Sequence, residues 1–444
     1  MAAADGATGP WDGPRRRSPH FQKPPAPEVL STGFAGRRWP ILRLAFVTSL
    51  LTILTLGLYR FWGRTRLRRW YWSAVRPGGH PLEYAGDPLE KLLGFLVAVV
   101  VLAFYLGIVN LGLMFASLAI LEDYVLPTIV TSLGLLPMIF YARYRARRYM
   151  LARTRWRGVR FGLEPGAWGY AWRALMHWAI TILTLGILWP RMTFMLEKYR
   201  TDRTTFGDAR LEQGGRWQAL LPGAIPVWAG LIVAGAGLLP AAADAYFAVG
   251  AELPPAVEDL LLWEVWDWPG WLGVAAAGLL LILFGVVHYR VRSFRVLAAG
   301  KRARVGGDRI GLASGARTGR VLAIAVLGNA AAFAIVLAVV AVAGSVAAQI
   351  VLSGGLEAVL EEDPLALLLS NPAAAVVPMA LYVLAFLLWG AARHAFVTMP
   401  RLRHYASTLR VTGPEALARI RQSERDEARE AGGLAEALDV GGAL

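Results

Sequence analysis

The chain has 444 residues, of which 56% are hydrophobic and 17% are charged, and its formal net charge at pH 7 is +15. Soluble domains contain about 45–50% apolar and about 25% charged residues, so this composition indicates a membrane protein. The sequence has no cysteine, which excludes a disulfide framework, a thiolate zinc site, an iron–sulfur cluster and a cysteine nucleophile.

The two ends of the chain are polar. Residues 1–38 are rich in Pro, Gly and Ala with basic clusters at 15–17 and 37–38, a composition that buries too little apolar surface to fold. We therefore expect a disordered basic arm. Residues 411–444 carry Arg421, Arg425 and Arg429 at four-residue spacing, which predicts a solvated cytoplasmic helix followed by a disordered end.

Apolar segments fill the region between these ends. A helix needs about 20 residues to cross a hydrocarbon core of about 30 Å. Two segments, 44–59 and 174–190, are too short to cross unless flanking arginines snorkel to the membrane surface. Six segments are long enough to span: 92–121, 124–142, 219–243, 270–289, 321–350 and 373–392.

The connections between the segments alternate in charge. Residues 122–123, 244–269 and 351–372 include acidic side chains and no Lys or Arg, whereas the other connections are rich in arginine. Basic loops stay in the cytoplasm, so six spans, with 44–59 and 174–190 as re-entrant or interfacial helices, place every basic connection and both chain ends inside. If both short segments crossed, the basic loops 60–91 and 143–173 would lie on opposite sides, so this alternative stays open.

The resulting prediction is an all-α polytopic membrane protein with three transmembrane helical hairpins, six spans in all. Its first region covers 39–218 with both short helices, and its second region covers 219–410.

The two short segments share an identical sequence. Residues 52–57 and residues 181–186 both read Thr-Ile-Leu-Thr-Leu-Gly, and each copy is followed by a tryptophan, a basic stretch and a tyrosine. Similar basic stretches occur at 66–71, 143–149, 191–199, 289–295 and 401–405, with short glycine-flanked stretches at 158–161, 207–211 and 307–310. The alternation in these stretches predicts short cytoplasmic strands, and the recurrence predicts an internal repeat of hairpins.

The Thr-Leu-Gly ending, the following tryptophan, the Arg-rich helix ending in tyrosine and the Gly-x-x-aromatic stretch resemble the YjgN family of bacterial inner-membrane proteins. The residues that carry this resemblance are Leu54–Tyr59, Trp62, Arg69, Tyr71, Gly79–Tyr84, Gly158–Phe161, Leu183–Pro190, Tyr199 and Gly207. It covers 35–220 well, and 220–410 by hydropathy and the basic stretches. The resemblance implies a multi-pass inner-membrane protein. It implies no activity, because the family is a domain of unknown function without catalytic residues to carry over.

The segments that mix arginine with aromatic residues are the most distinctive chemistry. A basic side chain near an anionic membrane surface contributes about 1 kcal/mol of attraction, and indole rings settle at headgroup depth. The alternative is that these segments only anchor the topology. The candidate lipid or partner contacts are Arg64, Arg66, Arg68, Arg69, Trp62, Trp70, Tyr71, Arg143, Arg145, Arg147, Arg148 and Tyr149.

The repeated Thr-Leu-Gly segments suggest a second candidate site, at Thr52, Thr55, Gly57, Thr181, Thr184 and Gly186. Discontinuous helices in paired repeats line substrate sites in transporters, whereas small and hydroxyl residues also simply ease close helix packing. The long spans nearly lack charges, which weakens the transporter interpretation because ion-coupled transport uses intramembrane acids or histidines.

No catalytic, cofactor or metal motif is present: the sequence contains no His-Glu-x-x-His, no phosphate loop and no G-x-S-x-G. No recognised nucleic-acid-binding module accompanies the basic charge. We therefore expect a non-enzymatic inner-membrane protein without cofactor or metal, whose cytoplasmic arginine and aromatic face contacts anionic phospholipids or a protein partner. The alternative is a transporter or channel built from hairpin repeats.

Overall fold

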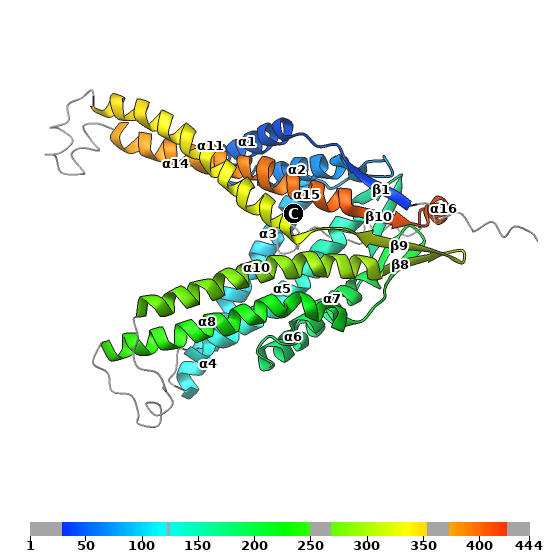
Figure 1. Cartoon of the computed structure of the whole chain (residues 1–444), viewed down its shortest axis with the longest axis horizontal. Coiled ribbons are helices and arrows are strands. Elements are labelled where there is room, and N and C mark those ends of the chain that lie inside the picture. Colours follow the sequence, from blue (N-terminus) through cyan, green and yellow to red (C-terminus); the bar gives the residue numbers. More distant parts are fainter. Residues whose placement is uncertain (1–28, 122–124, 249–267, 353–372, 424–444) are drawn as a thin grey trace, which may run out of the picture.

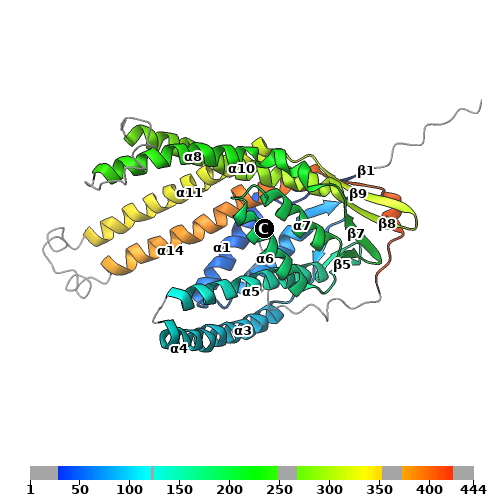
Figure 2. The ribbon, with the colours of Figure 1, turned by 90° about the horizontal axis from the view of Figure 1, so that it is seen from below.

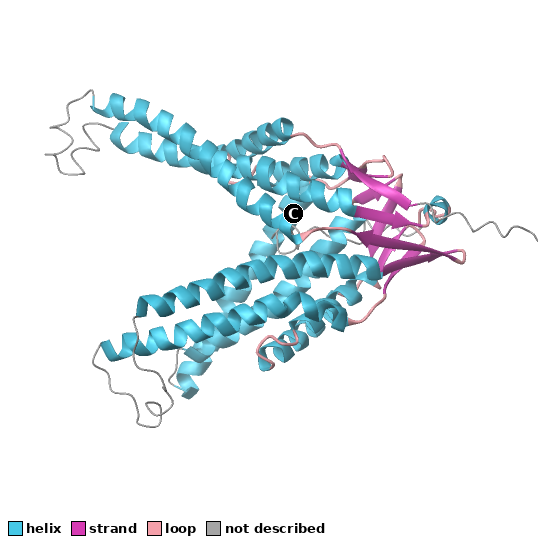
Figure 3. Ribbon diagram, in the orientation of Figure 1, coloured by secondary structure: helices cyan, strands magenta, loops and turns pink. Residues whose placement is uncertain are grey.

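The computed structural model describes residues 29–121, 125–248, 268–352 and 373–423. Long helices extend from one end of the molecule, and strands lie together at the other end (Figures 1 and 3). The predictions made for the arm before residue 29, for the acidic connections at 122–123, 249–267 and 353–372, and for the end of the tail after residue 423 lie outside the described residues.

The strands form one antiparallel sheet of ten strands in the order β2-β1-β10-β9-β8-β7-β6-β5-β4-β3. They are β1 (Val29–Phe34), β2 (Val75–Pro77), β3 (Leu82–Tyr84), β4 (Thr154–Trp156), β5 (Val159–Leu163), β6 (Thr204–Phe206), β7 (Ala209–Gln213), β8 (Lys301–Val305), β9 (Asp308–Ser314) and β10 (Leu409–Thr412). The edge strands β2 and β3 follow each other in sequence and contact each other, so the sheet curls into a nearly closed barrel.

The helices connect these strands. They are α1 (Arg38–Leu54), α2 (Arg60–Ala74), α3 (Pro88–Phe104), η1 (Tyr105–Val109), α4 (Asn110–Leu121), α5 (Val125–Ala152), α6 (Ala167–Leu183), α7 (Trp189–Thr201), η2 (Trp217–Leu220), α8 (Leu221–Ala248), α10 (Trp268–Gly300), α11 (Thr318–Leu352), α14 (Ala373–Arg393), η3 (His394–Thr398), α15 (Met399–Thr408) and α16 (Pro414–Ala418). α8 packs along α10, and α11 packs along α14 (Figures 1 and 2).

Within the described residues, five helical stretches are long and apolar enough to cross a membrane: Pro88–Ser117, Trp217–Pro240, Gly270–Gly300, Thr318–Val346 and Val376–Thr408. The predicted all-α fold with six spans is therefore wrong on two counts. The molecule contains a ten-stranded sheet, and the predicted span 124–142 is not among the five. Residues 125–142 of that segment form the first part of α5.

The sheet is assembled from strand pairs that each join a basic helix to the next helix. β2–β3 follows α2, β4–β5 follows α5, β6–β7 follows α7 and β8–β9 follows α10. β10 follows α15 and pairs with β1, which precedes α1. The glycine-flanked stretches noted in the sequence each cover a turn and the beginning of β5, β7 or β9. Each basic stretch thus lies in or near a helix that leads into the sheet.

The inner face of the curled sheet is a hydrophobic core. Trp156, Phe206, Ile310 and Val411 are buried there together with Ile420, which comes from the segment after α16. That segment closes one end of the barrel through a pair of hydrogen bonds. The Arg421 N–H donates to Asp208 Oδ1 over 3.1 Å, and the Asp208 N–H donates to the Arg421 carbonyl over 3.0 Å.

Candidate functional site

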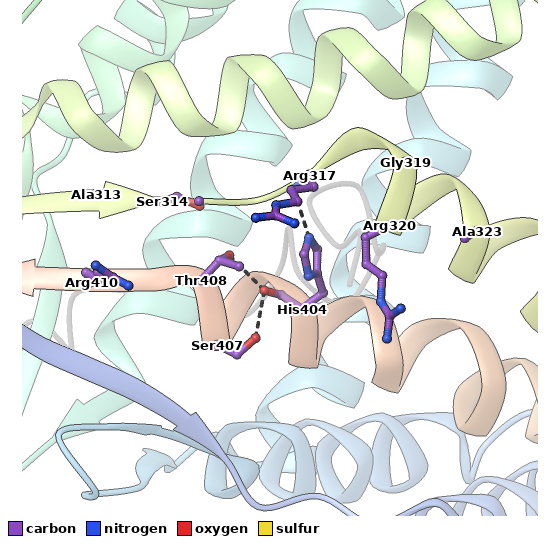
Figure 4. Close-up of a pocket in the computed structure, with 11 residues that line it drawn as sticks. Ala313, Ser314, Arg317, Gly319, Arg320, Ala323, His404, Ser407, Thr408 and Arg410 are labelled. Atoms are coloured by element: carbon purple, nitrogen blue, oxygen red, sulfur yellow. Dashed lines mark hydrogen bonds between the residues drawn. The ribbon is translucent and has the colours of Figure 1, made fainter.

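Two adjoining pockets form a groove between the beginning of α11 and α15, which we call the basic groove (Figure 4). One pocket, of about 980 Å³, lies where β9 ends and α11 begins. The second, of about 500 Å³, continues along α11. Both pockets are lined by Arg320, Ala323, His404 and Ser407, so they form one continuous surface.

The first pocket is polar and positively charged. Arg317, Arg320 and Arg410 line it and are exposed, and within the described part of the chain no acidic side chain forms an ion pair with them. Ser314 and Thr408 add hydroxyl groups. The pocket also contains the first turn of α11, where unpaired backbone N–H groups and the helix dipole favour an anion.

Hydrogen bonds hold the two walls of this pocket together. The Arg317 backbone N–H donates to His404 Nε2 over 3.0 Å, so this ring nitrogen carries no proton (Figure 4). The Thr408 hydroxyl donates to the His404 carbonyl over 2.8 Å, and the Gly315 N–H donates to the Thr408 carbonyl over 3.0 Å. The loop before α11 is therefore fixed against α15, and the backbone of Arg317 is held in place without a ligand.

The second pocket is mainly apolar. Ile324, Leu327 and Ala331 line it from one side of α11, and Phe396 and Pro400 line it from the opposite wall. The helix rises about 1.5 Å per residue, so this apolar wall extends about 16 Å from Arg320 to Ala331 along a candidate membrane span. The basic groove thus joins a positively charged end to a mainly apolar end.

Two further arginines border the apolar pocket but are held by the protein. Arg403 donates to the Gly36 carbonyl over 2.8 Å, and the Arg38 guanidinium lies 5.4 Å from the centre of the Phe396 ring. Neither pocket is lined by an aspartate or glutamate among the described residues. The whole basic groove therefore has a strong positive potential.

Of the seven candidate contacts predicted on α2, Arg68 and Tyr71 are buried, whereas Arg66 and Arg69 are exposed. Arg68 is buried and donates to the Tyr84 hydroxyl over 3.3 Å, and Arg69 donates to the Gly86 carbonyl over 3.0 Å. Tyr71 is fully buried, with its hydroxyl 2.9 Å from Nδ1 of His394. Of the other predicted contacts on this helix, Arg66 is exposed, whereas Arg64, Trp62 and Trp70 are half-buried.

Two of the five candidate contacts predicted on α5 are buried. Arg148 is buried and donates to the Leu163 carbonyl over 3.0 Å, and the hydroxyl of buried Tyr149 donates to Glu90 over 2.9 Å. Arg143 is exposed, whereas Arg145 and Arg147 are half-buried. Arg148 thus connects α5 to β5, and Tyr149 connects α5 to α3.

Arg147 belongs to a buried ion cluster centred on Glu197. Its guanidinium lies 3.5 Å from the carboxylate, Arg200 lies 2.7 Å away and Lys301 lies 2.6 Å away. Burial alone would raise the pKa of Glu197, but the three cations together hold that pKa well below its usual range. The cluster ties α5, α7 and β8 together.

One pocket brings the two predicted sites into contact. A pocket of about 430 Å³ between α1, α2 and α14 is lined by Thr52 from the Thr-Leu-Gly set and by Arg64, Arg68 and Tyr71 from the arginine and aromatic set. The Thr52 hydroxyl donates to the Thr48 carbonyl over 2.7 Å. The two sets come from α1 and α2, which pack against each other.

The Thr-Leu-Gly segments form the same turn twice. The Thr55 hydroxyl donates to the Leu51 carbonyl over 2.8 Å, and the Thr184 hydroxyl donates to the Ile180 carbonyl over 2.8 Å. Thr52 and Thr181 each accept, through their carbonyls, the N–H of the glycine five residues later, over 2.7 Å in both copies.

The backbone angles of the two turns match as well. Leu56 and Leu185 have φ of 50° and 49°, and Gly57 and Gly186 have φ of 94° and 85°. Left-handed backbone at a leucine is strained, so its occurrence in both copies shows that the shared sequence dictates this turn. α1 and α6 therefore each reverse into the next helix, α2 and α7, as a tight hairpin.

Both hairpin tips expose leucine. Leu56 is 96% exposed and Leu185 is 86% exposed, and both hairpins extend from the sheet toward the side on which the long apolar helices lie (Figures 1 and 2). Such exposure is costly in water, where burying a leucine side chain stabilises a protein by about 1.5–3 kcal/mol.

A family model described as "Bacterial protein of unknown function (DUF898)" matches residues 30–433, which include all the described strands except the first residue of β1. The chain belongs to this family. The resemblance to the YjgN family is thereby confirmed. No curated protein and no solved structure matches the chain. Together with the five candidate spans, the family match indicates a bacterial membrane protein.

The arginines of the basic groove were not among the residues singled out from the sequence. Arg317 and Arg320 follow a glycine-rich stretch that matched no phosphate-binding motif, and Arg410 lies about ninety residues later in the chain. One pattern in the sequence could have indicated the groove. Arg317 and Arg320 are three residues apart, about one helical turn, and they come directly before the predicted apolar span 321–350.

Proposed function

We propose that the protein is a multi-pass, non-enzymatic protein of the bacterial inner membrane that binds an anionic phospholipid of the cytoplasmic leaflet in the basic groove. One observation carries this proposal: the groove joins three arginines, which have no acidic partner in the described part of the chain, to an apolar wall on a candidate span. An anionic phospholipid has the same division into a charged head and an apolar tail.

The energetics favour such a ligand. Each of Arg317, Arg320 and Arg410 adds about 1 kcal/mol of attraction for an anionic headgroup, and each methylene of the tail buried in the groove adds about 0.8 kcal/mol. Arginine forks also match the paired oxygens of a phosphate. A soluble phosphate compound would leave the apolar half of the groove unused.

The charge pattern supports an orientation with the sheet in the cytoplasm. The helix ends that lead into the sheet are rich in arginine, and basic segments are retained on the cytoplasmic side. In this orientation the chain termini are cytoplasmic. The common order of basic helix, strand pair and next helix also supports an origin of these units by internal duplication.

The same orientation directs the two Thr-Leu-Gly hairpins into the cytoplasmic leaflet. Leu56 and Leu185 at their tips then lie among lipid tails, which accounts for their exposure. The hydroxyl groups of Thr55 and Thr184 accept hydrogen bonds from backbone N–H groups of the turn. Such internal hydrogen bonds are needed inside a membrane, because little water is present there to replace them. The hairpins thus act as lipid-anchored supports beside the spans.

The lipid proposal is tested with Arg317→Gln, Arg320→Gln and Arg410→Gln combined in one variant. With about 1 kcal/mol lost for each arginine, affinity for phosphatidylglycerol is expected to fall about a hundredfold, while affinity for phosphatidylcholine is unchanged. Lipid binding to the purified protein in detergent, followed by native mass spectrometry, measures both. Arg76→Gln, an exposed arginine on β2, is the matched control and should retain wild-type selectivity. Unchanged selectivity in the triple variant would refute the proposal.

A further inference from the structure

A second basic pocket lies on the outer face of the sheet. It has a volume of about 470 Å³ and is bordered by β7, β8, β9 and the end of α7. Its described lining is Lys198, Asp202, Arg210, Glu212, Gln213, Gly214, Arg302, Arg304 and Arg309. None of these residues is aromatic or aliphatic, so the pocket offers nothing to a lipid tail or a stacked ring.

The charges of this pocket do not balance. Five cationic side chains face two carboxylates, and the Asp202 carboxylate is already engaged with Lys198 over 2.8 Å and with the Gln213 N–H over 2.7 Å. Arg210 donates to Glu164 over 3.2 Å. Arg302, Arg304 and Arg309 are exposed, and among the described residues no acid forms an ion pair with them.

The strand pairing forces two of these arginines together. Arg304 on β8 is directly opposite Arg309 on β9, on either side of a tight turn at Gly306 and Gly307, whose φ values are 55° and 92°. Like charges directly opposite each other destabilise a strand pair. Asp308, the nearest acid in the hairpin, instead pairs with Arg419. Among the described residues, no acid forms an ion pair that would relieve this repulsion.

The pairing register of β8 and β9 also places three arginines on the same face of the sheet. Ala303 and Ile310 point into the core of the barrel, so the alternation of the strands places Arg302, Arg304 and Arg309 on the outer face. Arg302 is opposite Gly311 on β9 and opposite Glu212, another residue of the pocket, on β7. Three guanidinium groups thus border one open volume.

The pocket is distant from the apolar segments. The apolar stretch of α10 ends near residue 289, and the remaining helix to Gly300 adds about 16 Å before β8 begins. The headgroup layer of a bilayer is only about 5–8 Å deep on each side. The β8–β9 hairpin lies at the end of the molecule opposite the free ends of α8 and α10 (Figure 1). A lipid headgroup does not extend to this pocket.

We infer that this pocket binds a small soluble compound carrying two or more phosphate groups, held by Arg302, Arg304 and Arg309. Three guanidinium groups that form no ion pair with an acid among the described residues match two phosphate groups, which carry about −3 to −4 in total near pH 7. The purely polar lining selects for the phosphate groups rather than for an attached ring or chain. The inference is independent of the basic groove.

The experiment uses the full-length protein in detergent and pyrophosphate as the probe, with binding measured by calorimetry and by the shift in Tm. Pyrophosphate is expected to raise the Tm more than potassium chloride of equal ionic strength does. In a variant with Arg304→Gln and Arg309→Gln, pyrophosphate affinity is expected to fall more than about tenfold. Without pyrophosphate this variant should be at least as stable as the wild type, because the repulsion is removed, which separates lost binding from misfolding.

Two controls distinguish this site from general charge effects and from the basic groove. Arg160→Gln removes one arginine from the cross-strand pair with Arg155, which does not line the pocket, and should bind pyrophosphate normally. Arg317→Gln should do so as well. Equal Tm shifts with potassium chloride, equal binding by the double variant, or displacement of pyrophosphate by phosphatidylglycerol vesicles would each overturn the inference.

Discussion

At the scale of single residues, Glu197 determines how the sheet is attached to the helices. It is only 8% exposed and is the one carboxylate in contact with Arg147, Arg200 and Lys301 within the described residues. Removing one partner from a buried ion cluster is costly, because the remaining charges lose both their counter-charge and their solvent. The charge of Glu197 is therefore needed for stability.

This role predicts a pH dependence. The pKa of Glu197 is lower in the folded than in the unfolded chain, so its stabilisation is complete above its unfolded value of about 4.5 and is lost as the pH falls below that value. Thermal unfolding in detergent should show a larger drop in Tm between pH 7 and pH 4 for the wild type than for Glu197→Gln.

At pH 7 the Glu197→Gln variant should be about 3–5 kcal/mol less stable than the wild type. Adding Lys301→Gln should restore part of this loss, because it removes one of the unpaired cations. Equal stability of wild type and Glu197→Gln at pH 7 would contradict the role given to this carboxylate.

At the scale of elements, the two Thr-Leu-Gly hairpins show a short sequence that determines a local structure without help from its surroundings. The turn is the same in both copies, although one hairpin packs against α14 and the other against α5. Its threonines bond the backbone of the preceding turn, and its glycine adopts a left-handed conformation that suits few other residues.

The placement of these hairpins in lipid is testable by depth. Leu56→Cys and Leu185→Cys, each carrying a nitroxide, are expected to be more accessible to oxygen than to a polar nickel complex in reconstituted vesicles, because oxygen concentrates in lipid. Glu212→Cys on the exposed face of β7 is the control and should show the opposite preference. If positions 56 and 185 were as accessible to the nickel complex as position 212 is, insertion of the hairpin tips into the bilayer would be ruled out.

At the scale of the whole molecule, the proposed orientation places the sheet in the cytoplasm and the acidic connections outside. Because the chain has no cysteine, single cysteines report topology directly. In intact cells whose outer membrane is permeable to the reagent, an impermeant thiol reagent should label Gly250→Cys and Gly354→Cys but not Glu212→Cys, which should react only after lysis. Labelling of position 212 before lysis would reverse the orientation.

Much of the helical part of the fold could be predicted from the sequence, because a span is a local property of about 20 consecutive residues. Five of the six predicted spans correspond to candidate membrane helices. The sheet could not be assembled in the same way. Its strands have three to seven residues, and only three of them were marked by flanking glycines.

The pairing of the strands depends on residues far apart in sequence. β7 pairs with β8 across more than eighty residues, and no local pattern specifies that partner. The basic groove was not predicted for the same reason. Arg320 and Arg410 line one pocket only because α11 packs against α15, which leads into β10. The opposite error occurred at Arg68 of α2 and Arg148 of α5, which were predicted to contact lipid or a partner but are buried. An arginine-rich composition does not reveal which guanidinium groups bind partners inside the molecule.

The pairing of β1 with β10 has a consequence for biosynthesis. Val29 is opposite Thr412, so β1, the first of the described strands to be synthesised, waits for β10, the last of them, before it gains this neighbour. Until then β1 is an open edge, able to pair with another nascent chain. Closure of the barrel therefore comes after synthesis of every candidate span between these strands. A chain truncated before residue 409 is expected to insert into the membrane but to remain prone to aggregation. Pairing of β1 with β10 therefore distinguishes a correctly assembled molecule from an incomplete one.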